Sequence, residues 1–350
     1  FWKATTALLS LAVIALLAAH PGALKPLCSS GRTQHIRLFT DFQSGYAEGR
    51  PHPPPRSMPS PYTLTDIELD ALLTDDAPWG DATSWGLGIS ALPGRMHFHA
   101  RHAQVVCGSE EAARMGVLRG LEIKGEVVPS GTAVEPGTPL LSFSGRAADL
   151  HRVWKPAQTL MEYAGGIASA TAELLAAARR GNPLVRVACT RKHLPGSKSL
   201  SVKAILCGGA APHRLGISDT LLVFAEHRSF LGDLPPAQLI ARLKQAWPER
   251  QVVVEVGSAD EAARWMHAGA DVIQLEKCAP EIVRQVVTRA GTGRCQIAVA
   301  GGVTPDNAQA YAATGAQILV SSAPYQGAPR DVAVTMEAIP PCPPLTPARR

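Results

Sequence analysis

The stretch Gln251-Val252-Val253-Val254-Glu255-Val256-Gly257-Ser258-Ala259-Asp260-Glu261 decides the fold. Four of its first six residues are valines, a β-branched and apolar run that is typical of a buried strand, and Ser258 and Glu261 have the spacing of a capping box that opens a helix. The same strand-then-helix pattern recurs at a spacing of roughly twenty to twenty-five residues along the second half of the chain, which indicates stacked βα units around a parallel sheet.

Six strands are predicted in this region. They lie at 184–189, 219–224, 251–256, 271–275, 296–300 and 317–321. Between them, a helix near 168–180 ends at Gly181, and another helix has Pro305 in its first turn behind Thr304. Residues 166–335 are therefore predicted to form an α/β barrel, which is incomplete because six strands fall short of eight.

The segment before the barrel has a different pattern. Thr65 to Glu68 has the spacing of a capping box, and Ser109 is expected to cap a helix that runs to about Arg119. Alternating apolar and polar residues over 95–106, with Gly/Pro turns after them, indicate a small sheet. Residues 62–165 are therefore predicted to form a compact α+β domain.

The two ends of the chain are atypical. An apolar run over 7–19 follows Lys3 and resembles the central region of a secretory signal, and residues 49–61 are rich in proline. Two interpretations of residues 1–61 stay open: an export or membrane signal, or an extension ahead of a natural start at Met58. Residues 336–350 are expected to be a Pro-rich tail.

Composition limits the function classes. The chain of 350 residues is 46% hydrophobic and has a formal net charge of +5. This mild charge is spread out, with no Lys/Arg run and no interleaved aromatic residues, so the sequence favours acidic metabolites over nucleic acid as partners. The 7 cysteines are scattered without a Cys-x-x-Cys pair, which argues against a disulfide framework and for a reducing compartment, the cytoplasm.

Two loops in the second half concentrate positive charge. Residues 190–196 follow a predicted strand and include Arg191 and Lys192, and a second loop with Gly and Pro includes His213 and Arg214. Arginine grips phosphate or carboxylate through two hydrogen bonds, and lysine adds a point charge. A lone Arg-Lys pair is ordinarily a solvated surface feature. Its recurrence in two glycine-containing loops favours a site for a strongly anionic small molecule.

Other polar residues are predicted to share the same rim. Glu255 and Glu276 stand at the ends of two predicted strands, and Gly301-Gly302 follows another strand just before a helix. Barrel active sites lie at the carboxyl ends of strands, and a Gly-Gly turn before a helix presents backbone N–H groups to phosphate. These positions predict one anion-binding site.

The chain resembles a known family across residues 62–335. The motifs that carry the resemblance are Gly80-Asp81-Ala82-Thr83, Gly166-Ile167-Ala168, Thr190-Arg191-Lys192, Cys207-Gly208-Gly209, His213-Arg214-Leu215-Gly216, Glu255-Val256, and Ala300-Gly301-Gly302-Val303 with Asn307. In this order they resemble quinolinate phosphoribosyltransferase, also called nicotinate-nucleotide pyrophosphorylase. The resemblance implies an N-terminal open sandwich, a C-terminal incomplete barrel, a homodimer with shared active sites, and Mg²⁺-dependent use of phosphoribosyl pyrophosphate with an anionic aromatic acceptor.

Three departures from the family pattern affect the acceptor side. Lys155 stands where the family has an arginine that crosses into the partner's site, Phe224 stands where it has a lysine for a substrate carboxylate, and Glu276-Lys277 replaces Asp-Asn. Losing a lysine and a guanidinium fork is expected to weaken the grip on a dicarboxylate. These changes resemble the ModD branch, pyrophosphorylase-like proteins associated with molybdenum transport operons.

The resemblance also implies residue roles. Lys192 serves the pyrophosphate, and Glu255 and Glu276 hold magnesium and the ribose hydroxyls. The 5′-phosphate is cradled by Ala300, Gly301, Gly302 and Ser322. The acceptor is faced by Arg191, His213, Arg214, Phe224 and, from the other subunit, Lys155.

Two functional hypotheses stay open. The first is an active phosphoribosyltransferase, in the ModD branch or as the quinolinate enzyme of NAD biosynthesis; the second is a phosphate-ligand-binding protein without catalysis. The intact set of Arg191-Lys192, Glu255 and Gly301-Gly302 favours the enzyme. Phe224 favours a changed acceptor or the binding protein. Lys203 is expected to be structural or a phosphate contact. No metal is assigned to the closely spaced histidines at 97, 99 and 102, since alternating histidines usually form a polar strand face.

Overall fold

A computed structural model describes residues 63–340. The chain divides into two units, residues 1–56 and 57–350, and all described residues belong to the second. The signal-like run, the Pro-rich segment, Met58 and most of the expected tail lie outside the described residues. Over 63–340, the helices are too short or too polar to cross a bilayer.

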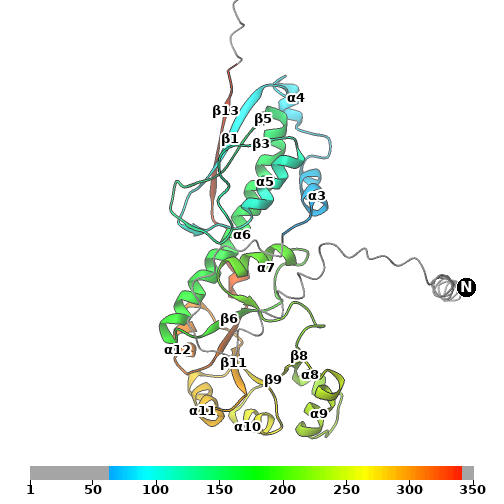
Figure 1. Cartoon of the computed structure of the whole chain (residues 1–350), viewed down its shortest axis with the longest axis vertical. Helices are drawn as coiled ribbons and strands as arrows, with labels where there is room; N and C mark the ends of the chain where they lie inside the picture. The colour runs from blue at the N-terminus through cyan, green and yellow to red at the C-terminus, as the bar shows by residue number, and fades with distance from the viewer. Residues whose placement is uncertain (1–62, 341–350) are drawn as a thin grey trace, which may run out of the picture. The chain divides into compact units, whose positions relative to one another are not determined.

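The second half of the described chain forms a seven-stranded parallel sheet (Figure 1). Its strands, in spatial order, are β7 (Ala211–Pro212), β6 (Arg186–Cys189), β12 (Ile318–Ser321), β11 (Gln296–Ala300), β10 (Val272–Glu276), β9 (Val252–Val256) and β8 (Leu221–Val223). Every neighbouring pair is parallel. The predicted incomplete α/β barrel is confirmed, and six of its strands stand where the apolar runs placed them. The two-residue strand β7 was missed because it is too short to show a pattern.

Helices alternate with these strands along the chain. They are α7 (Lys198–Cys207), α8 (Ala225–Arg228), α9 (Pro236–Ala246), α10 (Ala259–His267), α11 (Pro280–Ala290) and α12 (Pro305–Ala312). The strands carry apolar side chains on both faces, as buried parallel strands do. Ile273 and Leu275 pack with helix residues in the larger core, and Val272 packs with Ala298 and other strand residues in a smaller inner core.

The first part of the described chain is the predicted α+β region. An antiparallel sheet contains, in spatial order, β13 (Val332–Ala338), β1 (Pro93–Ala100), β5 (Pro139–Arg146) and β3 (Glu122–Ile123), and β2 (Gln104–Val105) pairs with β4 (Ala133–Val134). The helices here are α3 (Asp66–Asp76), α4 (Ala82–Gly86) and α5 (Ser109–Leu118). Phe98 and Phe143 meet edge to face in this core, with 6.2 Å between ring centroids.

A single helix, α6 (Ala147–Gly181), joins the two regions (Figure 1). The expected helix near 168–180 is only its last part, and the predicted boundary at 165/166 falls inside it. Leu150 and Val153 pack in the N-terminal core and Leu174 packs in the barrel core, so one helix buries its apolar stripe against both.

The chain then returns to the N-terminal sheet. Residues 336–338, which the sequence analysis assigned to the Pro-rich tail, belong to β13. Met336 pairs with Met96 and Val334 pairs with Phe98, and both lie against the N-terminal core. The alternating apolar positions of this segment are buried by pairing with a strand more than two hundred residues earlier in sequence.

Helix capping follows the sequence with two corrections. Thr65 forms the predicted capping box with Glu68, and Thr304 is the N-cap of α12. Ser109 does not cap α5: Gly108 does, with φ +89°, and Ser109 is the first helical residue. Ser258 accepts from the Glu261 N–H, but the Glu261 carboxylate accepts from the Gly257 N–H instead of the N–H of the N-cap residue, so the predicted capping box is only half formed.

Candidate functional site

The predicted site residues follow the carboxyl ends of the parallel strands. These ends lie at one edge of the sheet, since all seven strands run in the same direction. In spatial order they place His213 and Arg214 after β7, Arg191 and Lys192 after β6, Ser322 after β12, Ala300 and Gly301-Gly302 at the end of β11, Glu276 at the end of β10, Glu255 in β9, and Phe224 after β8. The fold thus brings these residues to one rim.

Arg214 and Phe224 form one corner of the rim. Arg214 is 9% exposed, and its guanidinium lies over the Phe224 ring, 5.5 Å from the centroid. Burial and the nearby charge of Arg191 both lower the pKa of Arg214. The exposed Arg191 guanidinium and the buried Arg214 guanidinium repel each other, so a bound anion would relieve an unfavourable charge arrangement.

His213 is fixed beside this corner. Its backbone N–H donates to the Cys189 carbonyl at 2.8 Å, which extends the β6–β7 pairing. Burial, assisted by the positive charge of Arg214, lowers the pKa of His213 to about 4. The imidazole is therefore neutral near pH 7 and can form hydrogen bonds without adding a third positive charge.

Glu255 and Glu276 lie on the inner face of the sheet. Gln274 Nε2 donates to Glu255 Oε2 at 2.7 Å. Burial raises the pKa of Glu255, the hydrogen bond from Gln274 opposes this rise, and the charge of Glu276 adds to it. The two carboxylates are thus close enough to interact electrically.

Gln274 is a site residue that the sequence analysis missed. It is 3% exposed, and its Oε1 has no hydrogen-bond partner among the described residues. A buried amide oxygen without a donor is costly. The available signal was a polar residue in the middle of the apolar strand at 271–275, but a single polar residue in a strand does not identify its neighbour on the adjacent strand.

The Gly301-Gly302 turn has the backbone shape that the prediction requires. Gly301 has φ +85°, and a Cβ added there would meet Glu276 Oε1 at 2.7 Å. Gly302 has φ +90° and open space where a Cβ would stand. Asn307 Nδ2 donates to the Gly302 carbonyl at 2.8 Å and fixes the turn ahead of α12. Backbone N–H groups in this turn can bind phosphate oxygens.

Tyr325 is a second residue that the sequence did not indicate. It lies in the 3₁₀ turn Ala323–Gln326, which begins after Ser322, and its hydroxyl donates to the Thr190 carbonyl at 2.9 Å. Burial raises the pKa of Tyr325. The contact ties the loop after β12 to the start of the loop that carries Arg191.

Lys155 is not placed at this rim by contacts within the described chain. It is an exposed residue of α6, and its Nζ contacts Gln158 Oε1 at 3.0 Å and lies 4.5 Å from the Trp154 ring centroid. Both contacts are to neighbours on its own helix. Its predicted role in a partner's site stays a prediction.

Metal ligation by the protein alone is limited. Over residues 63–340, no group of three or more His, Cys, Asp or Glu side chains is arranged to hold an ion. Glu255 and Glu276 still fit magnesium, because Mg²⁺ commonly binds one or two carboxylates and completes its shell with substrate phosphates and water.

A cavity of about 440 Å³ lies elsewhere, beside α4 and the first turns of α6. Trp79, Trp85, Arg146 and Arg152 are among its lining residues, and no predicted site residue lines it. We place the candidate site at the rim because the cations, carboxylates and glycine turn converge there.

Comparisons with known proteins show the family to which the chain belongs. Residues 81–165 match the family described as quinolinate phosphoribosyl transferase, N-terminal domain, and residues 167–335 match its C-terminal domain. A Rhodobacter capsulatus protein named "Putative pyrophosphorylase ModD" is 46% identical over 71% of this chain and 95% of its own length. The protein of the same name from Pasteurella multocida is 39% identical over 78% of this chain and 98% of its own length.

Solved structures support the same fold. The nicotinate-nucleotide pyrophosphorylase of Francisella tularensis superposes with a TM-score of 0.73 at 19% identity, covering 81% of this chain and 100% of that chain. Both domains of the family thus match in order, with relatives aligned over nearly their whole length. The chain belongs to the quinolinate phosphoribosyl transferase family, as a ModD-like pyrophosphorylase.

Proposed function

We propose that this protein transfers a phosphoribosyl group from phosphoribosyl pyrophosphate to an anionic, pyridine-carboxylate-like acceptor. The observation that carries the proposal is the convergence, on one rim, of cations, two carboxylates and a left-handed Gly-Gly turn. Each group matches a part of the donor: pyrophosphate, ribose hydroxyls and 5′-phosphate. Membership of the family supports the same reaction.

In this reaction the bond from ribose C1 to the pyrophosphate oxygen breaks, and the acceptor nitrogen forms a new bond to C1. Positive charge grows on the sugar while negative charge grows on the leaving group. Lys192, exposed after β6, would neutralise the leaving pyrophosphate. Glu255 and Glu276 would accept hydrogen bonds from the ribose hydroxyls and stabilise the cationic sugar. No covalent nucleophile is needed.

Two other parts of the rim would orient the donor. The N–H groups of the Gly301-Gly302 turn and Ser322 would bind the 5′-phosphate. Magnesium, when bound through Glu255 and Glu276 together with substrate oxygens, supplies positive charge to the pyrophosphate.

The corner formed by Arg214 and Phe224 suits an aromatic acid as the acceptor. Arg191 and Arg214 supply guanidinium groups for a carboxylate, and the Phe224 ring supplies an apolar wall. His213 is neutral because burial and Arg214 lower its pKa to about 4, so it can hydrogen-bond to the acceptor. A monocarboxylate suits this corner better than a dicarboxylate, since Phe224 offers no positive charge.

We further propose that a second copy completes each site. Lys155 is exposed and free to extend its ammonium toward another chain, its own contacts being confined to Trp154 and Gln158. The resulting arrangement would be a two-fold dimer.

A second function is favoured by one observation. Arg214 already lies over Phe224, so part of the positive charge at the acceptor corner is engaged with an aromatic ring. A protein that binds a phosphorylated ligand without transferring it is consistent with that arrangement.

The test measures pyrophosphate release from phosphoribosyl pyrophosphate and Mg²⁺ in the presence of a panel of pyridine and benzene carboxylates. We expect release that depends on one acceptor and is lost in Lys192→Ala. Donor binding without release for any acceptor would support the binding protein, and absence of donor binding would refute the proposed transferase.

A further inference from the structure

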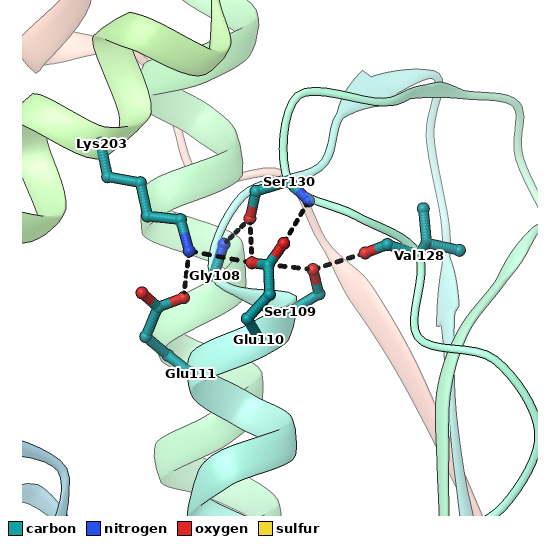
Figure 2. Close-up of polar contacts among 7 residues, drawn as sticks. All are labelled: Gly108, Ser109, Glu110, Glu111, Val128, Ser130 and Lys203. Atoms are coloured by element: carbon teal, nitrogen blue, oxygen red, sulfur yellow. Dashed lines mark hydrogen bonds and ion pairs between the residues drawn. The ribbon is translucent and has the colours of Figure 1, made fainter. Parts of the chain in front are cut away.

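A buried ion cluster joins the N-terminal region to the barrel (Figure 2). Lys203 of α7 is 2% exposed, and its Nζ lies 2.6 Å from Glu111 Oε2 and 2.9 Å from Glu110 Oε2, both on α5. Glu111 is fully buried. Removing one member of a buried ion pair leaves an uncompensated charge, so such a pair strongly constrains its partners.

The α5 side of the cluster is held in place by a neighbouring loop. The Ser130 N–H donates to Glu110 Oε1 at 2.8 Å, and the Ser130 hydroxyl also donates to Glu110 while accepting from the Gly108 N–H at 2.9 Å (Figure 2). Burial opposes ionisation, yet the hydrogen bonds from Lys203 and Ser130 lower the pKa of Glu110 to about 2. Lys203 therefore meets a carboxylate whose position is set by the N-terminal region.

The other side of the cluster is the helix between the two cationic loops. Helix α7 follows the loop of Arg191 and Lys192 and ends one turn before β7 and His213. Its Leu200 packs against the N-terminal core. The helix that separates the loops is thus anchored outside the barrel.

The cluster is not arranged for maximal stability. Glu111 Oε1 is buried and has no hydrogen-bond partner among the described residues. An apolar contact at this interface would avoid that desolvation cost. What the ions add is a fixed position for α7 relative to α5.

We propose that Lys203 is a positioning residue for the anion site: through its bonds to Glu111 and Glu110 it holds α7, and hence both cationic loops, in the geometry that binds ligand. The Lys203 ammonium is engaged by the two carboxylates, so its role is to position other groups. The effect on ligand rests on the function proposed above, whereas the effect on the loops does not.

The test compares wild-type protein with Lys203→Met, which keeps most of the side-chain volume and removes the charge. Hydrogen–deuterium exchange is measured below the melting temperature of each variant. We expect faster exchange in peptides covering 190–197 and 208–214, with peptides covering 252–256 and 272–276 unchanged. We also expect the Kd for phosphoribosyl pyrophosphate with Mg²⁺ to rise by about tenfold, which lies within the range known for substitutions that affect a site without touching its ligand.

Lys244→Met is the matched control. Lys244 Nζ lies 2.9 Å from Asp271 Oδ1, so this variant breaks a lysine–carboxylate pair that lies wholly within the barrel and is partly exposed. Asp271 precedes β10, at the opposite edge of the sheet from the rim. We expect exchange at 190–197 and 208–214, and the ligand Kd, to match wild type.

A rescue variant separates position from stability. Lys203→Glu combined with Glu111→Lys keeps the net charge of the cluster. It should restore the slow loop exchange that either single change abolishes.

If Lys203→Met does not fold, the same exchange measurement is made on Glu111→Gln, which keeps the shape of Glu111. Loops that exchange at the wild-type rate in a folded variant overturn the proposal. The two proposals can fail separately. If the variant's loops exchange faster but the wild-type protein does not bind phosphoribosyl pyrophosphate, the positioning role of Lys203 is upheld and only the proposed function is refuted.

Discussion

The Arg214 guanidinium lies 5.5 Å from the centroid of the Phe224 ring, at the edge of the sheet where the acceptor would bind. A cation over an aromatic face is stabilised by the ring's quadrupole. Phe224 also stacks on His227, with 5.7 Å between ring centroids. The Phe224 side chain therefore orients the Arg214 guanidinium, and it supplies no positive charge of its own to a bound acceptor.

Phe224→Lys is expected to change acceptor choice. The lysine adds a positive charge beside Arg214 and Arg191, so a dicarboxylate such as quinolinate should become a better acceptor and wild-type turnover of it should be poor. Steady-state kinetics with quinolinate would test this, with Phe224→Leu as the control that removes the ring without adding charge. Efficient quinolinate turnover by the wild type, unimproved in Phe224→Lys, would show that Phe224 does not set acceptor choice.

Phosphoribosyl pyrophosphate with Mg²⁺ is expected to raise the melting temperature. A ligand that binds only the folded state stabilises it by about 2.7 kcal/mol when its concentration is 100 times Kd. Thermal unfolding with and without the ligand would measure the shift, and Arg191→Ala should reduce it. A folded protein that shows no shift at millimolar ligand contradicts the proposed function.

His213 is expected to make stability depend on pH. Its pKa is about 4 in the folded state against an ordinary 6.5, so below pH 6.5 the unfolded chain binds a proton that the folded chain does not. The free energy of unfolding should therefore fall as the pH drops from 6.5 toward 4, by up to about 1.4 kcal/mol per pH unit. Chemical denaturation of wild type and His213→Gln over this range would isolate the effect. Parallel curves for the two proteins would argue against a depressed pKa.

The Gly-Gly turn allows a matched pair of substitutions. Gly301→Ala and Gly302→Ala both place a Cβ on a left-handed backbone, which costs roughly 1–2 kcal/mol. Only Gly301→Ala also drives a Cβ into Glu276, 2.7 Å from Oε1. Equilibrium unfolding should therefore show a larger loss for Gly301→Ala. Equal losses would mean that Glu276 moves away at little cost.

Lys155 offers a test of shared sites. If Lys155 completes the partner's pocket, Lys155→Ala and Arg191→Ala chains should each be nearly inactive alone. A mixed dimer would collect both lesions in one site and leave the other intact, so random exchange should restore up to about a quarter of full activity. A mixture that stays inactive despite measured subunit exchange would place Lys155 in its own chain's site or in none.

The sequence was most informative where structure is local. Apolar runs located the barrel strands. Because these strands are parallel, residues at their carboxyl ends lie at one rim. Arg191, Glu276 and Gly301 could therefore be assigned to one site from the sequence. Contacts between distant segments were not predictable in this way. In the sequence, Gln274 is only a polar residue within an apolar strand. Its role becomes visible when the structure shows that it pairs with Glu255 on the neighbouring strand.

Helix α6 shows the same limit. Pro156 lies inside the helix and Gly165-Gly166 interrupts its pattern, so local propensity favours a break that packing against two cores overrides. The β13 strand could not be recognised as part of the first region because strand order is set by pairing, not by position in the chain. Ser109 likewise has the chemistry of a cap, but its hydroxyl donates to the Val128 carbonyl instead.

Strand β13 also determines when the first region can finish folding. During synthesis, the ribosome releases β1 and β5 long before Val332–Ala338, and until then one edge of β1 has exposed N–H and C=O groups. An unpaired edge strand is a site for aggregation. The nascent chain must therefore protect β1 while the whole barrel is being made. A chain terminated before Val332 would keep all seven strands of the parallel sheet but leave that edge of β1 permanently open.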